Sequence, residues 1–191
     1  MKYSILVLIL SVFYCSTVKE VKRDNDLKGK LSGLKRIAVA VPSASKLTKM
    51  EQLFLAEVSK DQIAAKKDFI VFRSPDKFKG GCTKDNPKIE GVFQIDSVQE
   101  EKGNSLKIQL NSSLINCRDG KTVWSAVSAG SFSADSRENE SLRKTYTQKF
   151  GLGIESRVNP YFRMINEMLE ELESPVLNES EKDEKIEADS V

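Results

Sequence analysis

Hydrophobic and polar residues are spaced in three different ways along the chain, and each spacing predicts a kind of element. Residues 35–41 and 69–72 are short apolar runs, which are typical of strands that are buried on both faces. Between them, at residues 47–67, apolar side chains recur every three or four positions, which predicts an amphipathic helix. Residues 89–96 and 106–111 alternate with a period of two, as half-buried strands do. The chain therefore opens as strand, helix, strand, and a hairpin follows.

The later part of the pattern predicts an antiparallel sheet that is followed by a helix. A turn at residues 100–104 joins the two alternating segments, and a second turn leads into an apolar strand at residues 122–132. Trp124, the only Trp, is expected in the core at the edge of the sheet. Residues 161–172 have helical spacing, with Pro160 suited to the first turn. We therefore expect an α/β (α+β) fold in which strand, helix and strand precede a three-stranded antiparallel meander and a C-terminal helix, forming one mixed sheet with helices packed on it.

The first residues predict export from the cytoplasm. Lys2 precedes an uncharged, apolar run at residues 5–14, which ends at Cys15. A membrane-spanning helix needs about 20 apolar residues, so this run is too short to span a bilayer. We predict that residues 1–14 are a signal peptide. The alternative is an ordinary signal peptide that is cleaved at a different bond, in which case Cys15 is incidental.

The position of Cys15 resembles the signal of a bacterial lipoprotein. In such a signal a positively charged start and a short apolar run precede a Cys, which is acylated and becomes the mature N-terminus. Tyr14 departs from the usual pattern, which has a small residue before the Cys, and residues 11–15 look more like the looser spirochaete form. The resemblance implies lipidation of Cys15 and attachment to a bilayer, since two acyl chains suffice for a stable anchor.

Composition divides the remainder into three parts. Residues 15–34 have an excess of Lys and Arg and few apolar side chains, so we predict a lipidated flexible stalk. Residues 174–191 are strongly acidic and nearly lack apolar side chains, so we predict a disordered acidic tail. Residues 35–173 are long enough to bury a sizeable core and are predicted to form a single globular α/β domain.

Two further cysteines predict a disulfide. If Cys15 carries lipid, Cys82 and Cys117 remain, and an even remainder in an exported protein favours a disulfide between them. The predicted hairpin places Cys117 opposite the residues just before residue 89, so the loop that carries Cys82 can fold back onto it. Closing such a loop stabilises a fold by about 3 to 4 kcal/mol in the chain-entropy estimate. A reactive thiol pair is disfavoured, because the two cysteines lack the CxxC spacing.

Charge and composition narrow the possible chemistry. The 191 residues include 30 Lys+Arg and 28 Asp+Glu, and a net charge of +2 is too small to predict binding to nucleic acid. The chain has no His, which removes Ser-His and Cys-His nucleophile pairs and the usual zinc ligands. Glu90 and Asp96 lie on the predicted wet face of one strand, where solvated charges are commoner than acid–base pairs. We therefore expect no catalysis, no cofactor and no metal.

Three short motifs resemble those of known envelope proteins. Residues 35–42 are similar to the first strand of the small α/β domain found in the N-terminal part of TolB, in CsgG-type lipoproteins and in lipoprotein activators of penicillin-binding proteins. Residues 91–95 and 119–125 are similar to a later strand and to a turn with its strand. Together with the Cys15 signal, they make the chain most similar to spirochaete-type bacterial lipoproteins of uncharacterised role. The resemblance implies a fold and a location, but not an activity.

These observations predict a membrane-anchored lipoprotein of the bacterial cell envelope that acts as a non-catalytic binding or scaffolding module. Its expected partners are the bilayer, through acylated Cys15, and an envelope protein. Ser16 follows the Cys in place of the acidic residue that retains enteric lipoproteins at the inner membrane, which favours the outer membrane, on its periplasmic or its surface-exposed face. The alternative is a soluble secreted enzyme or small-ligand carrier with an ordinary signal peptide.

Overall fold

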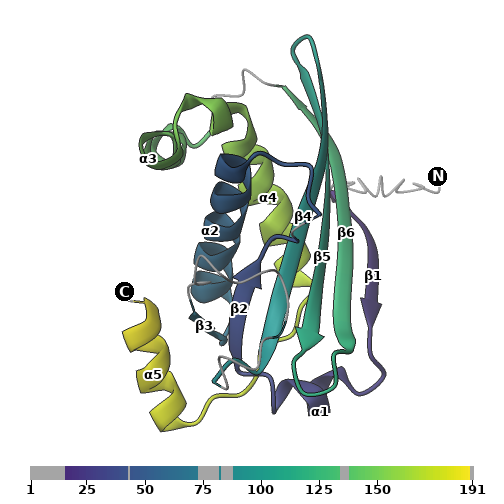
Figure 1. Ribbon diagram of the computed structural model, residues 1–191, viewed down its shortest axis with the longest axis vertical. Coiled ribbons are helices and arrows are strands. Elements are labelled where there is room, and N and C mark those ends of the chain that lie inside the picture. Colours follow the sequence, from purple (N-terminus) through teal and green to yellow (C-terminus); the bar gives the residue numbers. More distant parts are fainter. Residues whose placement is uncertain (1–15, 43, 73–81, 83–87, 134–137, 190–191) are drawn as a thin grey trace, which may run out of the picture.

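The structure is a computed structural model, and it describes residues 16–42, 44–72, 82, 88–133 and 138–189. Within these residues the elements follow one another in this order: β1 (Val18–Arg23), α1 (Leu27–Leu31), β2 (Arg36–Ala40), α2 (Lys49–Lys66), β3 (Ile70–Phe72), β4 (Gly91–Lys102), β5 (Ser105–Asn116), β6 (Thr122–Ser133), α3 (Glu140–Phe150), the 3-10 turn η1 (Leu152–Ile154), α4 (Glu155–Glu170) and α5 (Glu179–Asp189). The strands form one layer, and α2, α3 and α4 lie on the same side of it (Figure 1). The predicted mixed sheet with helices packed on it is confirmed.

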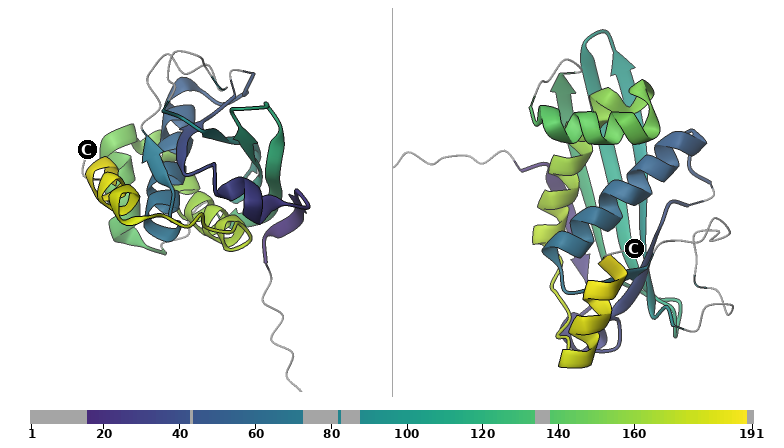
Figure 2. Two further views of the ribbon diagram at one scale, coloured as in Figure 1. Left: turned by 90° about the horizontal axis from the view of Figure 1, so that it is seen from below. Right: turned by 90° about the vertical axis from the view of Figure 1, so that its left-hand side faces the viewer.

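The sheet has the strand order β1-β6-β5-β4-β2-β3. β2 pairs in parallel with both β3 and β4, and α2 supplies the crossover that parallel β2 and β3 require. β4, β5 and β6 form the predicted antiparallel meander, and β1 pairs with the outer edge of β6. The right-hand view of Figure 2 looks onto the helical side of this sheet, where α2 and α4 cross the strands. The core therefore lies between α2, α4 and one face of the sheet.

Local signals explain the start of α2 and the packing of its inner face. The hydroxyl of Thr48 accepts a hydrogen bond from the backbone N–H of Glu51 at 3.3 Å, and the Glu51 carboxylate accepts one from the backbone N–H of Thr48 at 2.8 Å. This reciprocal capping box satisfies two N–H groups at the helix start. Phe54, one turn further on, is buried and stacks on Tyr161 of α4 with ring centroids 5.7 Å apart. Trp124 is also buried, as predicted, and stacks on a phenylalanine of β4. Its predicted place at the sheet edge is wrong, because β1 pairs with β6 on the outer side.

The helices after the meander differ from the prediction. α4 begins at Glu155, so Pro160 lies inside the helix and not in its first turn. α3 was not predicted, because Tyr146 is its only buried residue and its other positions are mostly polar. Both helices owe their extent to tertiary packing more than to a local sequence signal.

The segment that was predicted to be a flexible stalk is part of the folded body. The prediction is wrong for residues 16–34, because β1 pairs with β6 and α1 packs into the core. The side chains of Leu27 and Leu31 are only 4% and 2% exposed. An edge strand needs apolar side chains only at its inward positions, here Val18 and Val21, so its composition resembles that of a linker.

The predicted disordered tail also folds. Residues 179–189 form α5, which packs beside β3, so the prediction of disorder is wrong for the described part of the tail. Composition could not show this, because α5 is held by ion pairs to distant residues and by few apolar contacts. The predicted signal peptide, residues 1–14, and Cys15 lie outside the described residues.

Candidate functional site

The first two described residues are held by the side of α4. Glu167 accepts a hydrogen bond from the backbone N–H of Thr17 at 2.6 Å and another from the Thr17 hydroxyl at 2.7 Å. The hydroxyl of Ser128 in β6 donates to the hydroxyl oxygen of Thr17 at 2.7 Å. The hydroxyl of Ser16 lies 3.5 Å from the same carboxylate oxygen of Glu167. We call Ser16, Thr17, Ser128 and Glu167 the anchor junction.

Glu167 is ionised at the anchor junction. Burial would raise the pKa of Glu167, but hydrogen bonds from Thr17 and Arg163 outweigh burial and hold this pKa below its ordinary value. Arg163 donates to the other carboxylate oxygen at 2.9 Å. Hydrogen bonds to an ionised acceptor are stronger than neutral ones, so the junction fixes the backbone of Thr17 firmly.

The sequence of α4 explains why Glu167 points at the start of the chain. Arg163 and Glu167 are four residues apart, so they lie on the same face of the helix. Met164 and Met168, each one position further along, are fully buried in the core. Burial of the methionines fixes the rotation of α4 about its axis, and this rotation directs the Arg163–Glu167 pair toward β1.

The anchor junction limits how far Cys15 can lie from the body. Cys15 itself is outside the described residues, so the structure does not place its side chain. It is two residues before Thr17, and successive Cα atoms are about 3.8 Å apart, so the two Cα atoms are separated by at most about 8 Å. Any group that Cys15 carries is therefore attached next to the folded body.

The structure joins the predicted cysteine pair. Cys82 and Cys117 form a disulfide with their Cα atoms 5.1 Å apart. The backbone N–H of Cys117 donates to the carbonyl of Glu90 at 2.9 Å, which holds the end of β5 beside the start of β4. The disulfide thus connects Cys82 to the end of the sheet where β4 begins.

The two carboxylates that were predicted to be solvated are both engaged in the fold. Glu90 accepts hydrogen bonds from the backbone N–H groups of Lys35 and Arg36 at 2.7 and 2.8 Å. Asp96 accepts a hydrogen bond from the hydroxyl of Ser45 at 2.6 Å. The prediction for these residues is wrong, because the chain that precedes β2 and the chain that follows it both come close to β4.

The described residues were also searched for other kinds of site. They contain no group of three His, Cys, Asp or Glu placed to hold a metal ion. None of their helices is long and apolar enough to cross a membrane. A shallow hollow of about 400 Å³ lies against the parts of β4, β5 and β6 that are nearest the β4–β5 turn. Its lining includes Val98, Lys107 and Gln109. These three side chains alternate with core residues, so they belong to the face of the sheet that carries no long helix.

Comparison with known proteins finds similarity of fold only. No protein-family model matches the chain, and no curated protein matches it. The chain is similar to the PelC dodecamer from Paraburkholderia phytofirmans, with 16% identity and a TM-score of 0.47 over 75% of this chain and 97% of that chain. It is also similar to the lipoprotein GNA1162 from Neisseria meningitidis, with 14% identity and a TM-score of 0.38 over 65% and 96% of the two chains. A minor lipoprotein from Acinetobacter baumannii matches with 14% identity and a TM-score of 0.31 over 70% and 91%. At these values no residue role is carried over.

Proposed function

We propose that this chain is a membrane-anchored lipoprotein of the bacterial cell envelope and that its folded body is a non-catalytic binding or scaffolding module. The anchor junction is the observation that carries this proposal. A flexible linker after Cys15 would be enough for attachment alone, whereas a fixed backbone also sets how the folded body is oriented at the membrane. Here Thr17 is fixed by Glu167 and Ser128, and β1 begins at the next residue.

The anchor junction also gives the body a preferred orientation. β1 lies at one edge of the molecule, on the opposite side from α2 and α5 (Figure 1). If acylated Cys15 enters the bilayer about two residues before Thr17, the β1 side of the body faces the membrane. The surfaces of α2 and α5 then face away from it and are open to an envelope protein.

We include the outer membrane in the proposal. Enteric lipoproteins are retained at the inner membrane by an acidic residue directly after the acylated Cys. Here Ser16 occupies that position, which favours the outer membrane. The non-catalytic role is supported by the chemistry of the chain, which has no His to act as a base near neutral pH.

Metabolic labelling with an alkyne analogue of palmitate tests the anchor. We expect the wild-type chain to be labelled and to enter the detergent-rich phase of a phase-separating detergent, and we expect Cys15→Ala to lose both properties. Cys82→Ala/Cys117→Ala is the matched control, because it removes together the two cysteines that form the disulfide and are predicted to carry no lipid. Unchanged labelling of Cys15→Ala would overturn the proposal. Release of the unlabelled wild-type chain into the medium would instead support a soluble secreted enzyme or ligand carrier.

A further inference from the structure

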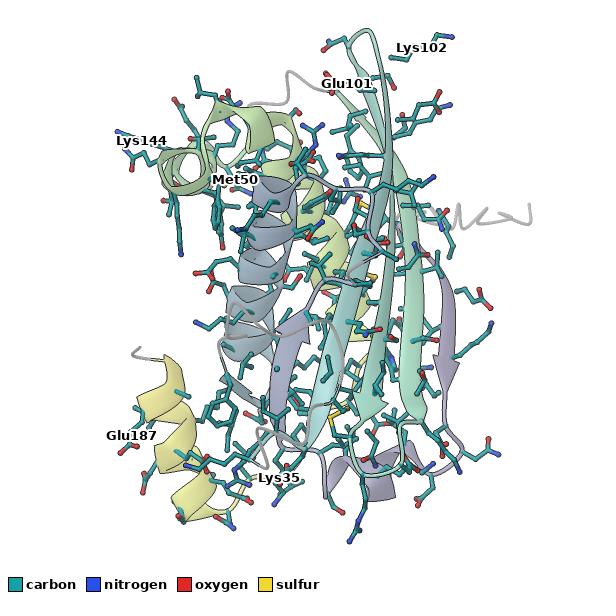
Figure 3. The ribbon with its side chains drawn as sticks, in the orientation of Figure 1. Lys35, Met50, Glu101, Lys102, Lys144 and Glu187 are labelled. Carbon is teal, nitrogen blue, oxygen red and sulfur yellow. A yellow bond between two sulfur atoms is a disulfide. The ribbon has the colours of Figure 1, made fainter. Side chains whose placement is uncertain are left out.

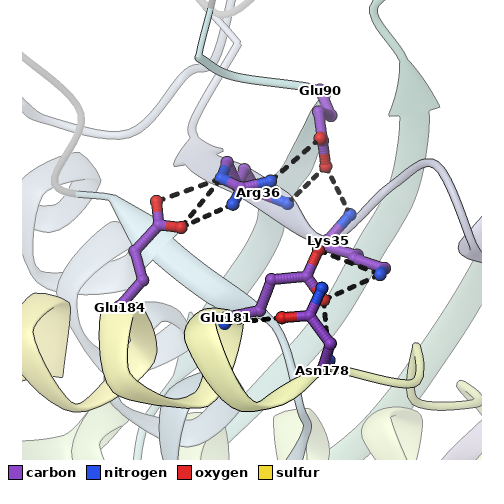
Figure 4. Close-up of polar contacts among 6 residues, drawn as sticks. All are labelled: Lys35, Arg36, Glu90, Asn178, Glu181 and Glu184. Carbon is purple, nitrogen blue, oxygen red and sulfur yellow. Dashed lines mark hydrogen bonds and ion pairs between the residues drawn. The ribbon is translucent and has the colours of Figure 1, made fainter.

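The acidic helix α5 is held against the start of β2 by ion pairs (Figure 4). Nζ of Lys35 lies 2.8 and 3.0 Å from the two carboxylate oxygens of Glu181. Nε of Arg36 lies 3.0 and 3.1 Å from the two oxygens of Glu184. Glu181 and Glu184 are three residues apart, so both lie on the same face of α5. One face of a helix therefore presents two carboxylates to two adjacent basic residues.

The basic residues are also held in position by contacts that do not involve α5. Glu90 accepts hydrogen bonds from the backbone N–H groups of both Lys35 and Arg36, and one of its oxygens lies 3.2 Å from a terminal nitrogen of the Arg36 guanidinium. Lys88 is close enough to help lower the pKa of Glu184, although the hydrogen bond from Arg36 is the larger cause. We call Lys35, Arg36 and Lys88 the basic strip. Figure 3 shows Lys35 at the end of the molecule opposite the β4–β5 hairpin tip.

Apolar contacts contribute little to the attachment of α5. Within and just before this helix, the side chains of Ile186 and Val176 are 69% and 81% exposed, and Leu177 is the one large apolar side chain that is buried. α5 has 11 residues, and an isolated helix of that length is marginal in water. Its docking therefore depends on partly buried ion pairs and on the hydrogen bond that Lys185 donates to the backbone carbonyl of Lys67. Salt weakens such ion pairs, and an equally acidic competitor can replace them.

We propose that the basic strip is a docking surface for an acidic helical segment of a partner protein, and that α5 occupies this surface in the free chain. The partner that fits carries two carboxylates three residues apart on one helix face, as Glu181 and Glu184 do. α5, which covers the strip, lies on the opposite side of the molecule from β1 (Figure 1), where a protein can reach it while β1 faces the bilayer. The inference rests on the proposed binding role, but it does not depend on the acylation of Cys15.

Peptide binding to the full chain tests the proposal. The probe is a fluorescein-labelled peptide with the sequence of residues 174–191, followed by fluorescence anisotropy at 50 mM salt. In the double variant Glu181→Gln/Glu184→Gln the chain's own helix loses both of its ion pairs with the basic strip. We expect the peptide to bind this variant at least tenfold more tightly than wild type, and we expect Lys35→Gln in the same background to abolish the gain.

A matched control removes the same amount of charge from another face of α5. Glu179 pairs with Lys182 inside the helix, and Asp183 is exposed, so Glu179→Gln/Asp183→Asn leaves the contacts with the strip in place. We expect this control to bind the peptide as weakly as wild type does. The near-ultraviolet circular dichroism of Trp124 reports whether each variant is folded.

Three results would overturn the proposal. The first is equal affinity of the peptide for wild type, control and double variant, and the second is no binding to a folded double variant. The third is binding of the double variant to phosphatidylglycerol vesicles but not to the peptide, which would make the strip a lipid contact. Loss of palmitate labelling would change none of these results, so failure of the anchor and failure of the strip are distinguishable.

Discussion

At the N-terminal end, residues 16–34 join the body through backbone hydrogen bonds to β6 and through buried leucines. At the C-terminal end, α5 joins it through ion pairs to the basic strip and leaves most of its surface in solvent. Both ends are rich in charge, and neither resembles a core element in composition. We therefore expect the N-terminal end to unfold only with the whole domain, and α5 to detach while the rest stays folded.

Truncating one leucine or isoleucine in each end gives the largest expected contrast. Leu31→Ala in α1 removes a core side chain and leaves a cavity, so it should lower the free energy of unfolding by about 2 to 5 kcal/mol. Ile186→Ala in α5 removes an exposed side chain and should change it by less than about 0.5 kcal/mol. Urea unfolding followed by Trp124 fluorescence measures both. Similar losses in the two variants would show that α5 is also part of the core.

The anchor junction has a smaller expected effect. Glu167→Ala leaves the N–H and the hydroxyl of Thr17 without their acceptor, and an unpaired buried polar group costs about 1 to 3 kcal/mol. Glu170→Ala, on an exposed position of the same helix, is the control and should cost less than about 0.5 kcal/mol. The same urea titrations measure both variants. Equal losses would contradict the claim that Glu167 fixes Thr17 to the folded body.

Low pH should release α5 but not β1. The pKa values of Glu181 and Glu184 are lowered, chiefly by hydrogen bonds from Lys35 and Arg36. A lowered pKa in the folded state stabilises docking above the ordinary glutamate pKa of about 4.3, and this stabilisation is lost as the pH falls below it through the folded-state value. In a pH titration from 7 to 3, ¹⁵N relaxation should show α5 becoming mobile below the ordinary glutamate pKa, while β1, whose backbone pairs with β6, stays rigid. A mobile β1 beside a rigid α5 would reverse the comparison.

Added salt should give the smallest difference in behaviour between α5 and β1. Raising the salt concentration from 0.05 to 0.5 M weakens the partly buried ion pairs of α5. Amide hydrogen exchange in α5 should therefore accelerate by roughly threefold to tenfold, as expected when pairs worth about 1 kcal/mol are weakened. Exchange in β1 should not change, because its protection comes from pairing with β6. Native-state exchange followed by mass spectrometry resolves the two segments, and equal acceleration in both would contradict the assignment of different attachments.

The sequence predicted those elements whose own periodicity is strong. α2, the meander and the burial of Trp124 follow from local spacing, and the cysteine count predicted the Cys82–Cys117 disulfide. β1 and α5 were missed because their stability comes from distant residues. Val18 and Val21 are too few to indicate a strand until β6 is present, and the acidic positions of α5 look solvated until Lys35 and Arg36 are placed opposite them.

The same reasoning applies to the anchor junction. Acylation of Cys15 was predicted from a local sequence signal. The contact between Thr17, two residues further on, and Glu167 could not be predicted, since 150 residues separate them. The contact could have been predicted from the pair Arg163 and Glu167, which are four residues apart and lie next to two buried methionines. This spacing identifies a polar face of α4 beside its buried face, and a polar face can bind another segment.

The central claim is that the folded body begins directly after an acylated Cys15. Intact-mass spectrometry of the full-length product, purified from membranes of the native host, tests this claim most directly. The account predicts a mature chain of residues 15–191 that carries the added mass of acyl chains on its first residue. A chain that begins at any other residue, or that begins at Cys15 without acyl groups, would contradict it.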